Sequence, residues 1–109
     1  TFEYVGLTTV FEFSSQNYAD TINLRKDERL IKICKRNNAT EYINPIGGTE
    51  LYTKNQFAQH GIKLHFLRTN PLQYRQFGHS FIPNLSIIDV MMFNTIEQIH
   101  EMLDNFELL

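Results

Sequence analysis

The stretch that decides the fold lies at residues 42–52 and reads YINPIGGTELY. A short apolar run at residues 41–43 stops at Asn44-Pro45, and after Gly47-Gly48 the chain resumes as a polar segment with helical spacing. This order predicts a strand that passes into a helix through a tight loop. Adjacent glycines let backbone N–H groups approach a ligand without an intervening Cβ, and helix N-termini attract anions. The loop is a candidate ligand edge. A plain turn is an equal alternative, because the spacing fits neither a dinucleotide fingerprint nor a phosphate-binding loop.

Composition restricts the class of protein. At 109 residues the chain is expected to form one domain, and 42% hydrophobic with 20% charged residues is typical of a globular fold. The net charge of −2 gives no reason to expect nucleic acid or an anionic membrane as partner. No apolar run approaches the roughly 20 residues that cross a bilayer. The single cysteine, Cys34, excludes an internal disulfide. We expect a soluble cytoplasmic protein, and the start at Thr1 suggests a piece of a longer chain.

Hydrophobic periodicity predicts alternating strands and helices. Strands are predicted at residues 8–13, 41–43 and 62–67, and helices at residues 25–37, 54–60, 87–93 and 96–104. Capping boxes mark the starts of the last three helices at Thr53 and Gln56, Ser86 and Asp89, and Thr95 and Gln98. The order predicts an α/β fold: a small parallel sheet with alternating strands and helices, Rossmann-like and three-layered, followed by two C-terminal helices. Three strands leave a bare edge, so either residues 1–7 and the tail add strands or a missing segment completes the sheet.

Ligands of open α/β sheets bind beyond the carboxyl ends of the strands. Here that rule collects Ser14-Ser15, residues 44–49 and residues 68–70. For Ser15, capping of the strand end is the alternative to substrate binding. One face of the helix at residues 25–37 is basic, and either grips phosphate or, as is more usual, is solvated opposite a core. The four histidines form no pair of the His-Glu-x-x-His type, so no metal site is predicted.

Two further pairs of polar residues have both a structural and a functional interpretation. Tyr74 and Gln76 lie two residues apart on an irregular segment, where they either face one ligand or tether the loop. Ser86 and Asp89 have the spacing of a reactive pair, but that spacing is also what a helix N-terminal box requires. Asp89 is able to serve in both ways.

Several blocks together resemble one family. They are YINPIGGTELY at residues 42–52, Phe57, Gly61-Ile62, Tyr74-x-Gln76 and FxPxLSIID at residues 81–89. From about residue 14 to residue 93 the chain resembles the C-terminal half of WbqC-like proteins, and the Leu-Ser-Ile-Ile-Asp block is the most specific part. The other half of that family opens with a Gln-Pro-x-Tyr-x-Pro segment that this chain lacks. The resemblance implies that residues 1–109 form a single α/β domain from the C-terminal part of a longer protein, active in surface-polysaccharide (O-antigen) biosynthesis.

The resemblance further implies a transferase that moves an amino-acyl, for example glycyl, group onto a sugar or sugar nucleotide. In this hypothesis Gly47 and Gly48 hold an anionic or carbonyl oxygen, and Asp89 is the catalytic base. The expected substrate-binding residues are Ser15, Asn44, Gly47, Gly48, Tyr52, Tyr74, Gln76 and Ser86, and the strand-end rule adds Arg68. The expected partner is a small molecule, a sugar nucleotide or amino-acyl donor, with no nucleic acid, membrane insertion, cofactor or metal. A homo-oligomer is left open. Since no nucleophile–base pair is evident, a non-catalytic sugar-nucleotide-binding or protein-interaction module is the competing hypothesis.

Overall fold

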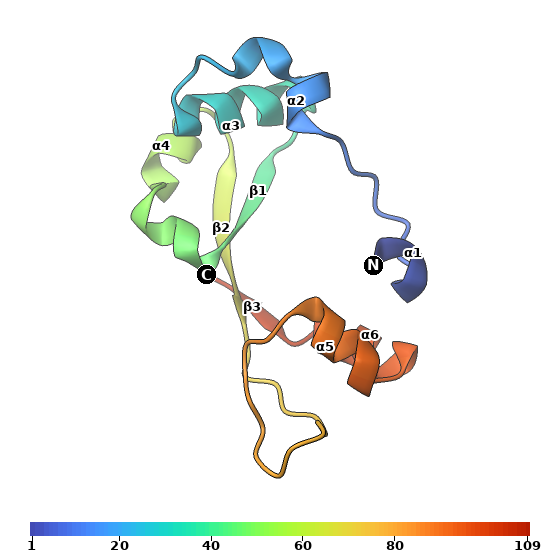
Figure 1. The fold of residues 1–109 in the computed structure, drawn as a ribbon. Coiled ribbons are helices and arrows are strands. Elements are labelled where there is room, and N and C mark those ends of the chain that lie inside the picture. The colour runs from blue at the N-terminus through green and yellow to red at the C-terminus, as the bar shows by residue number, and fades with distance from the viewer. The chain divides into compact units, whose positions relative to one another are not determined.

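The computed structural model describes all of residues 1–109 (Figure 1). The elements follow in the order α1 (Phe2–Val5), α2 (Ser14–Asn17), η1 (Ala19–Thr21), α3 (Lys26–Arg36), β1 (Glu41–Pro45), η2 (Ile46–Glu50), α4 (Lys54–Ala58), β2 (Lys63–Thr69), α5 (Ile87–Phe93), α6 (Ile96–Leu103) and β3 (Phe106–Leu108), where η denotes a 3-10 helix. The chain divides into two compact units. The sheet unit is Val10–Arg68 with Leu108–Leu109, and the helical unit is Thr1–Thr9 with Thr69–Glu107. None of the helices combines the length and the apolar composition that a membrane span needs.

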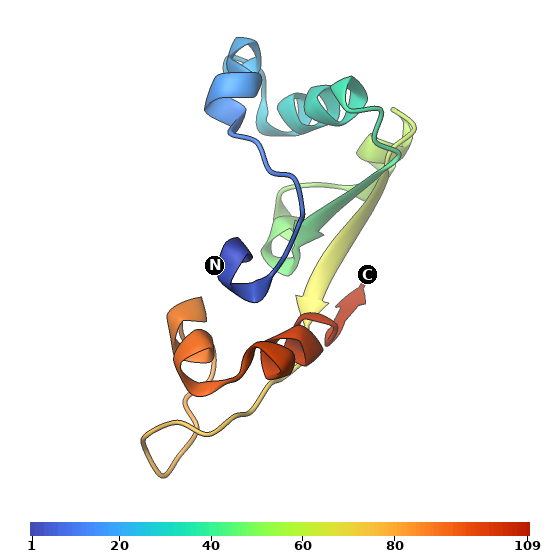
Figure 2. The ribbon, with the colours of Figure 1, turned by 90° about the vertical axis from the view of Figure 1, so that its right-hand side faces the viewer.

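The sheet is mixed and has the strand order β1-β2-β3. β1 and β2 run parallel, as predicted (Figure 2), and the register places Glu41 opposite Lys63. Phe66 and Leu109 exchange both backbone hydrogen bonds, at 3.0 and 2.8 Å, which is the pattern of an antiparallel pair. The expectation of an all-parallel sheet is therefore wrong, and the extra strand comes from the tail.

The strand predicted at residues 8–13 is wrong. This segment is irregular up to α2, and Val10 is 86% exposed. β-propensity measures how well a side chain fits a pleated, half-buried surface. No neighbouring strand offers such a surface here, so the β-branched and aromatic residues do not form a strand. Residues 1–7 likewise add none, because they contain α1.

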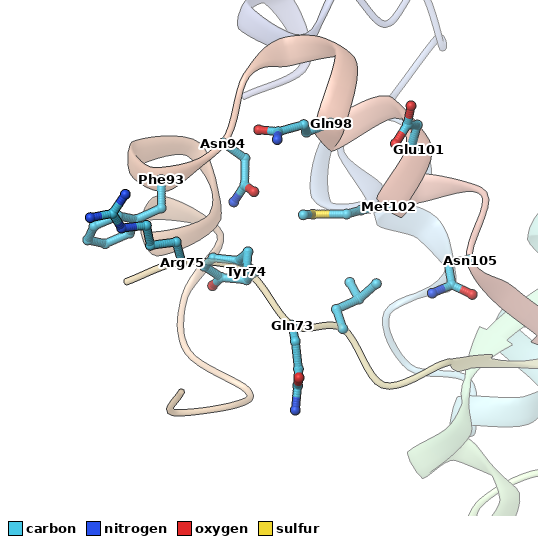
Figure 3. A pocket seen from close by; sticks show the side chains of 10 residues that line it. Gln73, Tyr74, Arg75, Phe93, Asn94, Gln98, Glu101, Met102 and Asn105 are labelled. Carbon is cyan, nitrogen blue, oxygen red and sulfur yellow. The ribbon is translucent and has the colours of Figure 1, made fainter. Parts of the chain in front are cut away.

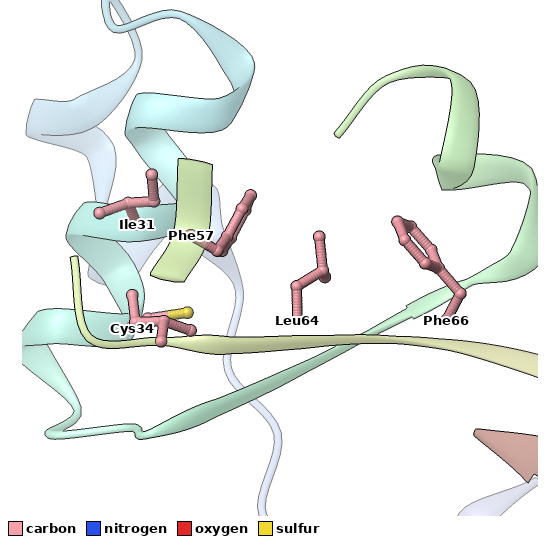
Figure 4. Close-up of a cluster of buried hydrophobic side chains, with 6 residues drawn as sticks. Ile31, Cys34, Phe57, Leu64 and Phe66 are labelled. Carbon is pink, nitrogen blue, oxygen red and sulfur yellow. The ribbon is translucent and has the colours of Figure 1, made fainter. Parts of the chain in front are cut away.

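Helices cover one face of β1 and β2 in the sheet unit. Leu64 and Phe66 alternate along β2 with exposed or half-buried neighbours, and they join the core that α3 and α4 complete (Figure 4). On the opposite face Ile43, the partner of His65 in the register, is 48% exposed. The mixed α/β class and the two C-terminal helices are confirmed, whereas the Rossmann-like three-layer arrangement is not.

Phe57 is the central side chain of the core. It is completely buried, its ring stacks on Tyr42 of β1 with centroids 5.7 Å apart, and it meets Tyr52 edge-on at 6.1 Å. The predicted capping box of α4 is wrong: Thr53 makes no side-chain cap, and the side chain of Gln56 donates to the buried carboxylate of Asp27. α4 is thus held by its tertiary contacts rather than by its own cap.

The basic face of α3 binds the segment that precedes the helix, residues 14–21. Arg36 binds both carboxylate oxygens of Asp20, and Arg29 donates to Thr21 Oγ1 at 3.0 Å and to the carbonyl of Ser14 at 3.3 Å. Lys32 lies 4.0 Å from Asp20. These contacts favour a structural role of the face over the phosphate-binding alternative.

Replacing Phe57 by alanine should lower the free energy of unfolding by about 3–5 kcal/mol, because it removes a buried ring and leaves a cavity. Phe77→Ala is the control, since Phe77 is 90% exposed and its ring meets that of Phe93 edge-on. The control should cost less than about 1 kcal/mol. Denaturant titration measures both, and equal losses would contradict the packing described above.

The ion pair of Asp20 predicts an acid-sensitive contribution to stability. The hydrogen bonds from Arg36 hold the pKa of the Asp20 carboxyl below its ordinary 3.8. A carboxyl group whose pKa is lower in the folded state stabilises the fold fully at any pH above its unfolded-state pKa. That stabilisation is lost as the pH falls through the folded-state pKa. Asp20→Asn should therefore lower the melting temperature at neutral pH, and the gap to wild type should close below pH 3.8.

Asp104→Asn is the matched control for that titration, because Asp104 is exposed and its side chain makes no hydrogen bond or ion pair. It should leave the pH profile of the melting temperature unchanged. A gap between Asp20→Asn and wild type that persists into strong acid would show that the ion pair does not cause the difference.

Candidate functional site

Four predicted site residues come together in the helical unit. Tyr74 donates its hydroxyl to Asp89 Oδ2 at 2.5 Å, and Gln76 Nε2 donates to the same oxygen at 2.9 Å. Ser86 precedes α5, and its carbonyl accepts from the backbone N–H of Asp89 at 3.0 Å. Asp89 is half-buried and makes no other side-chain hydrogen bond, so Oδ1 is not used by the protein.

The capping box predicted at Ser86 is only half formed. Ser86 Oγ accepts from the N–H of Ile88 at 3.2 Å, as an N-cap does. The Asp89 carboxylate makes no hydrogen bond to the N–H of Ser86, and its Oδ2 accepts from Tyr74 and Gln76 instead. A negative charge is thereby fixed in the first turn of α5, where the helix dipole favours it.

Gln76 also closes the long loop between β2 and α5. Its Oε1 accepts from the N–H of Ile82 at 2.9 Å, and its Nε2 donates to the Ile82 carbonyl at 3.1 Å. Tyr74 meets Phe81 edge-on at 5.1 Å. The interpretation of Tyr74 and Gln76 as tethers is thus supported, and the aromatic side chains do hold the loop in place.

Tyr74 is a neutral hydrogen-bond donor in this arrangement. Donation to Asp89, followed by burial, raises the pKa of its phenol above the ordinary value of 10.0. A phenol that keeps its proton is not a nucleophile, but it fixes one carboxylate oxygen and leaves the other available for a ligand.

Further polar residues lie beside this segment that were not predicted from the sequence. Leu72, Tyr74 and Gln76 are half-buried while the residues between them are exposed, which is the two-residue period of an extended chain. Arg75 lines a cavity of about 390 Å³ together with Glu101, Gln98 and Asn105 (Figure 3). The alternation of residues 71–76 was the available signal for this extended segment.

The sheet unit holds a second group of predicted residues. Asn44 Nδ2 donates to the Tyr42 hydroxyl at 2.9 Å, and burial raises the pKa of that phenol. A Cβ on Gly48 would lie 2.0 Å from Asn44 Oδ1 and 3.4 Å from the Tyr52 ring. Gly48 is therefore a packing glycine covered by side chains. Gly47 has open space around it.

The remaining predicted residues lie at different places. Leu67 pairs with Pro45, so Arg68 at the end of β2 lies at the same edge of the sheet as η2. Ser15 lies in α2, which runs beside α3 and away from η2 in both views (Figures 1 and 2). The predicted common edge thus collects Asn44, Gly47 and Arg68 but not Ser15. Nowhere in the structure do three or more His, Cys, Asp or Glu side chains gather as a metal site requires.

Substitution by alanine should have different effects on stability at the two glycines. Gly48→Ala should destabilise by about 1–3 kcal/mol, because the new methyl displaces the Asn44 amide. Gly47→Ala, where nothing lies within 4 Å, should stay within about 0.5 kcal/mol of wild type. In an Asn44→Ala background the cost of Gly48→Ala should shrink. Thermal or denaturant unfolding measures all four proteins, and equal effects at the two glycines would refute the assignment.

The comparisons with known proteins give one match. Searches of curated proteins and of solved structures found none. A family model, that of the WbqC-like protein family, matches residues 1–101. This range is wider than residues 14–93, to which the motifs pointed, and it includes α1 and most of α6. Because the match covers nearly the whole chain, this protein belongs to the WbqC-like protein family.

Proposed function

We propose that this chain serves as a transferase in surface-polysaccharide (O-antigen) biosynthesis, moving an amino-acyl group such as glycyl onto a sugar or sugar nucleotide. Family membership supports the general area of biology. The observation that carries the chemistry is the Asp89 carboxylate, oriented through one oxygen by Tyr74 and Gln76 with its second oxygen unused. The proposal places the reaction in the cytoplasm.

The proposed step is acyl transfer with Asp89 as general base. A hydroxyl or amino group of the sugar attacks the carbonyl carbon of an activated acyl donor, for example a thioester. Asp89 Oδ1 takes the proton from the attacking atom, the new C–O or C–N bond forms, and the bond to the leaving group breaks with its electron pair. General bases held in position contribute roughly 10²–10⁴-fold to such reactions. Tyr74 and Gln76 hold the base and, with Ser86, orient the acceptor.

The sheet unit contributes proposed contacts of its own. Gly47, Arg68 and Asn44 are assigned to an anionic or carbonyl group of a substrate, because an open glycine, a cation and an amide follow two parallel strand ends. Gly48 is assigned a packing role beneath Asn44. Tyr52 and Ser15 stay in the proposal on the strength of the family motif alone.

The competing function is that of a non-catalytic module that binds a sugar nucleotide or a protein. One observation favours it: no serine, threonine or cysteine side chain is hydrogen-bonded to a histidine or a carboxylate. Ser86 Oγ accepts from a backbone N–H, and Cys34 is buried in the core. Under that alternative, Asp89 serves only to hold the loop through Tyr74 and Gln76.

Substitution of the carboxylate separates the two functions. Asp89→Asn in the full-length protein should lower turnover by roughly 10²–10⁴-fold, because an amide accepts no proton. Stabilisation by the sugar nucleotide in a thermal-shift assay should remain, since Asn keeps a hydrogen-bond acceptor for Tyr74 or Gln76. Turnover is measured by transfer of a radiolabelled glycyl group to the sugar.

Asp104→Asn, on the same unit, is the control for loss of one carboxylate and should keep wild-type turnover. If Asp89→Asn retains turnover, the carboxylate only positions the loop and the base lies elsewhere. If the wild-type protein is stabilised by sugar nucleotides but transfers no acyl group, the binding-module function stands in its place.

A further inference from the structure

We infer that the helical unit contains a binding site for an uncharged sugar ring, in a cavity beside Tyr74 that is distinct from the proposed contacts for anions. The cavity has a volume of about 520 Å³, within the range of roughly 300–1,000 Å³ typical of small-molecule sites. It is formed by the chain from Thr69 to Tyr74 and by the loop from Phe81 to Leu85. The inference deepens the proposed function, because it names the substrate part that lies next to Asp89.

Charge is the first argument. None of the residues that line the cavity is charged. A phosphate or carboxylate buried there would lack the Arg or Lys partner that such groups require. Arg75 and Glu101 do not line it but line the adjoining cavity of about 390 Å³, which shares Leu72, Gln73 and Tyr74 with this one (Figure 3). The ligand of the uncharged cavity is therefore a neutral group and not the diphosphate of a nucleotide.

Unused amides are the second argument. Gln73 and Asn84 line the cavity, both are exposed, and their side chains make no hydrogen bond within the protein. Asn70 uses Nδ2 on Asn105 at 3.0 Å, which leaves its carbonyl oxygen available. Each amide offers both a donor and an acceptor, which suits hydroxyl groups because each hydroxyl also donates and accepts. Several amides around one cavity thus match a polyhydroxylated ligand.

The aromatic rings are the third argument. Tyr74 and Phe81 both line the cavity and meet at 75° with centroids 5.1 Å apart. Rings at this angle do not form the parallel slot in which a planar nucleobase stacks. A single ring face, negative at its centre, suits the C–H groups on one face of a pyranose. The geometry therefore favours a sugar ring over a base.

The position of the cavity links it to the candidate base. Tyr74 lines the cavity while its hydroxyl donates to Asp89, and Val90, the residue after Asp89, also lines it. A sugar held against Tyr74 thus lies next to the residue that holds the carboxylate. This is the place that an acceptor of the transfer reaction needs.

Saturation-transfer NMR on the full-length protein tests the inference, with methyl glycosides of neutral hexoses and N-acetylhexosamines as probes. We expect saturation transfer to these glycosides, and we expect that neither glucuronic acid nor uridine diphosphate displaces them. Gln73→Ala and Asn84→Gly should each weaken glycoside binding roughly 2- to 10-fold, the loss expected for one or two neutral hydrogen bonds.

Asn38→Gly is the matched control for Asn84→Gly. Both asparagines have a positive φ, 51° for Asn38 and 58° for Asn84, so glycine keeps the backbone conformation while removing the amide. Asn38 does not line the cavity and belongs to the sheet unit. Its variant should bind glycosides as wild type does. Gln73→Ala, at an exposed position, provides the second test should Asn84→Gly fail to fold.

Three outcomes would overturn the inference. The first is that no neutral glycoside shows saturation transfer. The second is that Asn38→Gly loses as much glycoside binding as Asn84→Gly, and the third is that uridine without a phosphate displaces the glycosides. The test contains no acyl donor, so its result does not depend on the transferase hypothesis. Conversely, loss of turnover in Asp89→Asn with no glycoside binding would leave the proposed function standing and refute only the sugar site.

Discussion

The sheet unit depends on the burial of the Phe57 ring. α4 has only five residues, far fewer than the roughly 12–15 that an isolated helix needs to be marginally stable in water. It forms because Phe57 packs between Tyr42 of β1 and Tyr52, and because Gln56 holds Asp27 at the start of α3. The same contacts fix the exit of β1, so the edge with Asn44 and Gly47 is set by the core.

In the helical unit the corresponding constraint is the competition for Asp89. As the third residue of α5 it has the position from which a carboxylate caps the helix N-terminus. Tyr74 and Gln76 take that carboxylate instead, and Gln76 at the same time closes the loop at Ile82. An acidic side chain at a helix start is thus converted from a local cap into a tertiary junction. A carboxylate held in this way is pre-organised, which general-base catalysis and loop anchoring both require.

The positions of the charged side chains restrict which ligand the cavity beside Tyr74 is able to bind. Arg29, Lys32 and Arg36, which in sequence look like a phosphate-binding stripe, are used on Thr21 and Asp20. The cavity of about 520 Å³ beside Tyr74 has an uncharged lining. The positive face is therefore structural, and the polar groups that remain available around this cavity are amides. Amides recognise hydroxyl groups well, so the chemistry of the free groups favours a neutral polyol over a nucleotide phosphate there.

The sequence by itself determined the elements whose signals are local. α3, α5, α6, β1 and β2 follow from periodicity, and the box of Thr95 and Gln98 is formed as its spacing predicts. Membership of the family was also recognised from sequence, and three residues of the quoted blocks, Tyr74, Gln76 and Asp89, do meet.

Only the tertiary structure decided the rest, because each remaining feature is a choice between partners far apart in the chain. Residues 8–13 have strand-forming side chains but no neighbouring strand. The tail forms β3 because Leu109 exchanges backbone hydrogen bonds with Phe66, which lies 43 residues earlier in the chain. Gln56 and Asp89 each had a local cap to make and instead took distant partners. Gly48 is needed because Asn44 lies over it, a contact that spacing alone does not reveal. Local pattern shows which bonds a residue is able to make, and the competition among tertiary partners decides which one it makes.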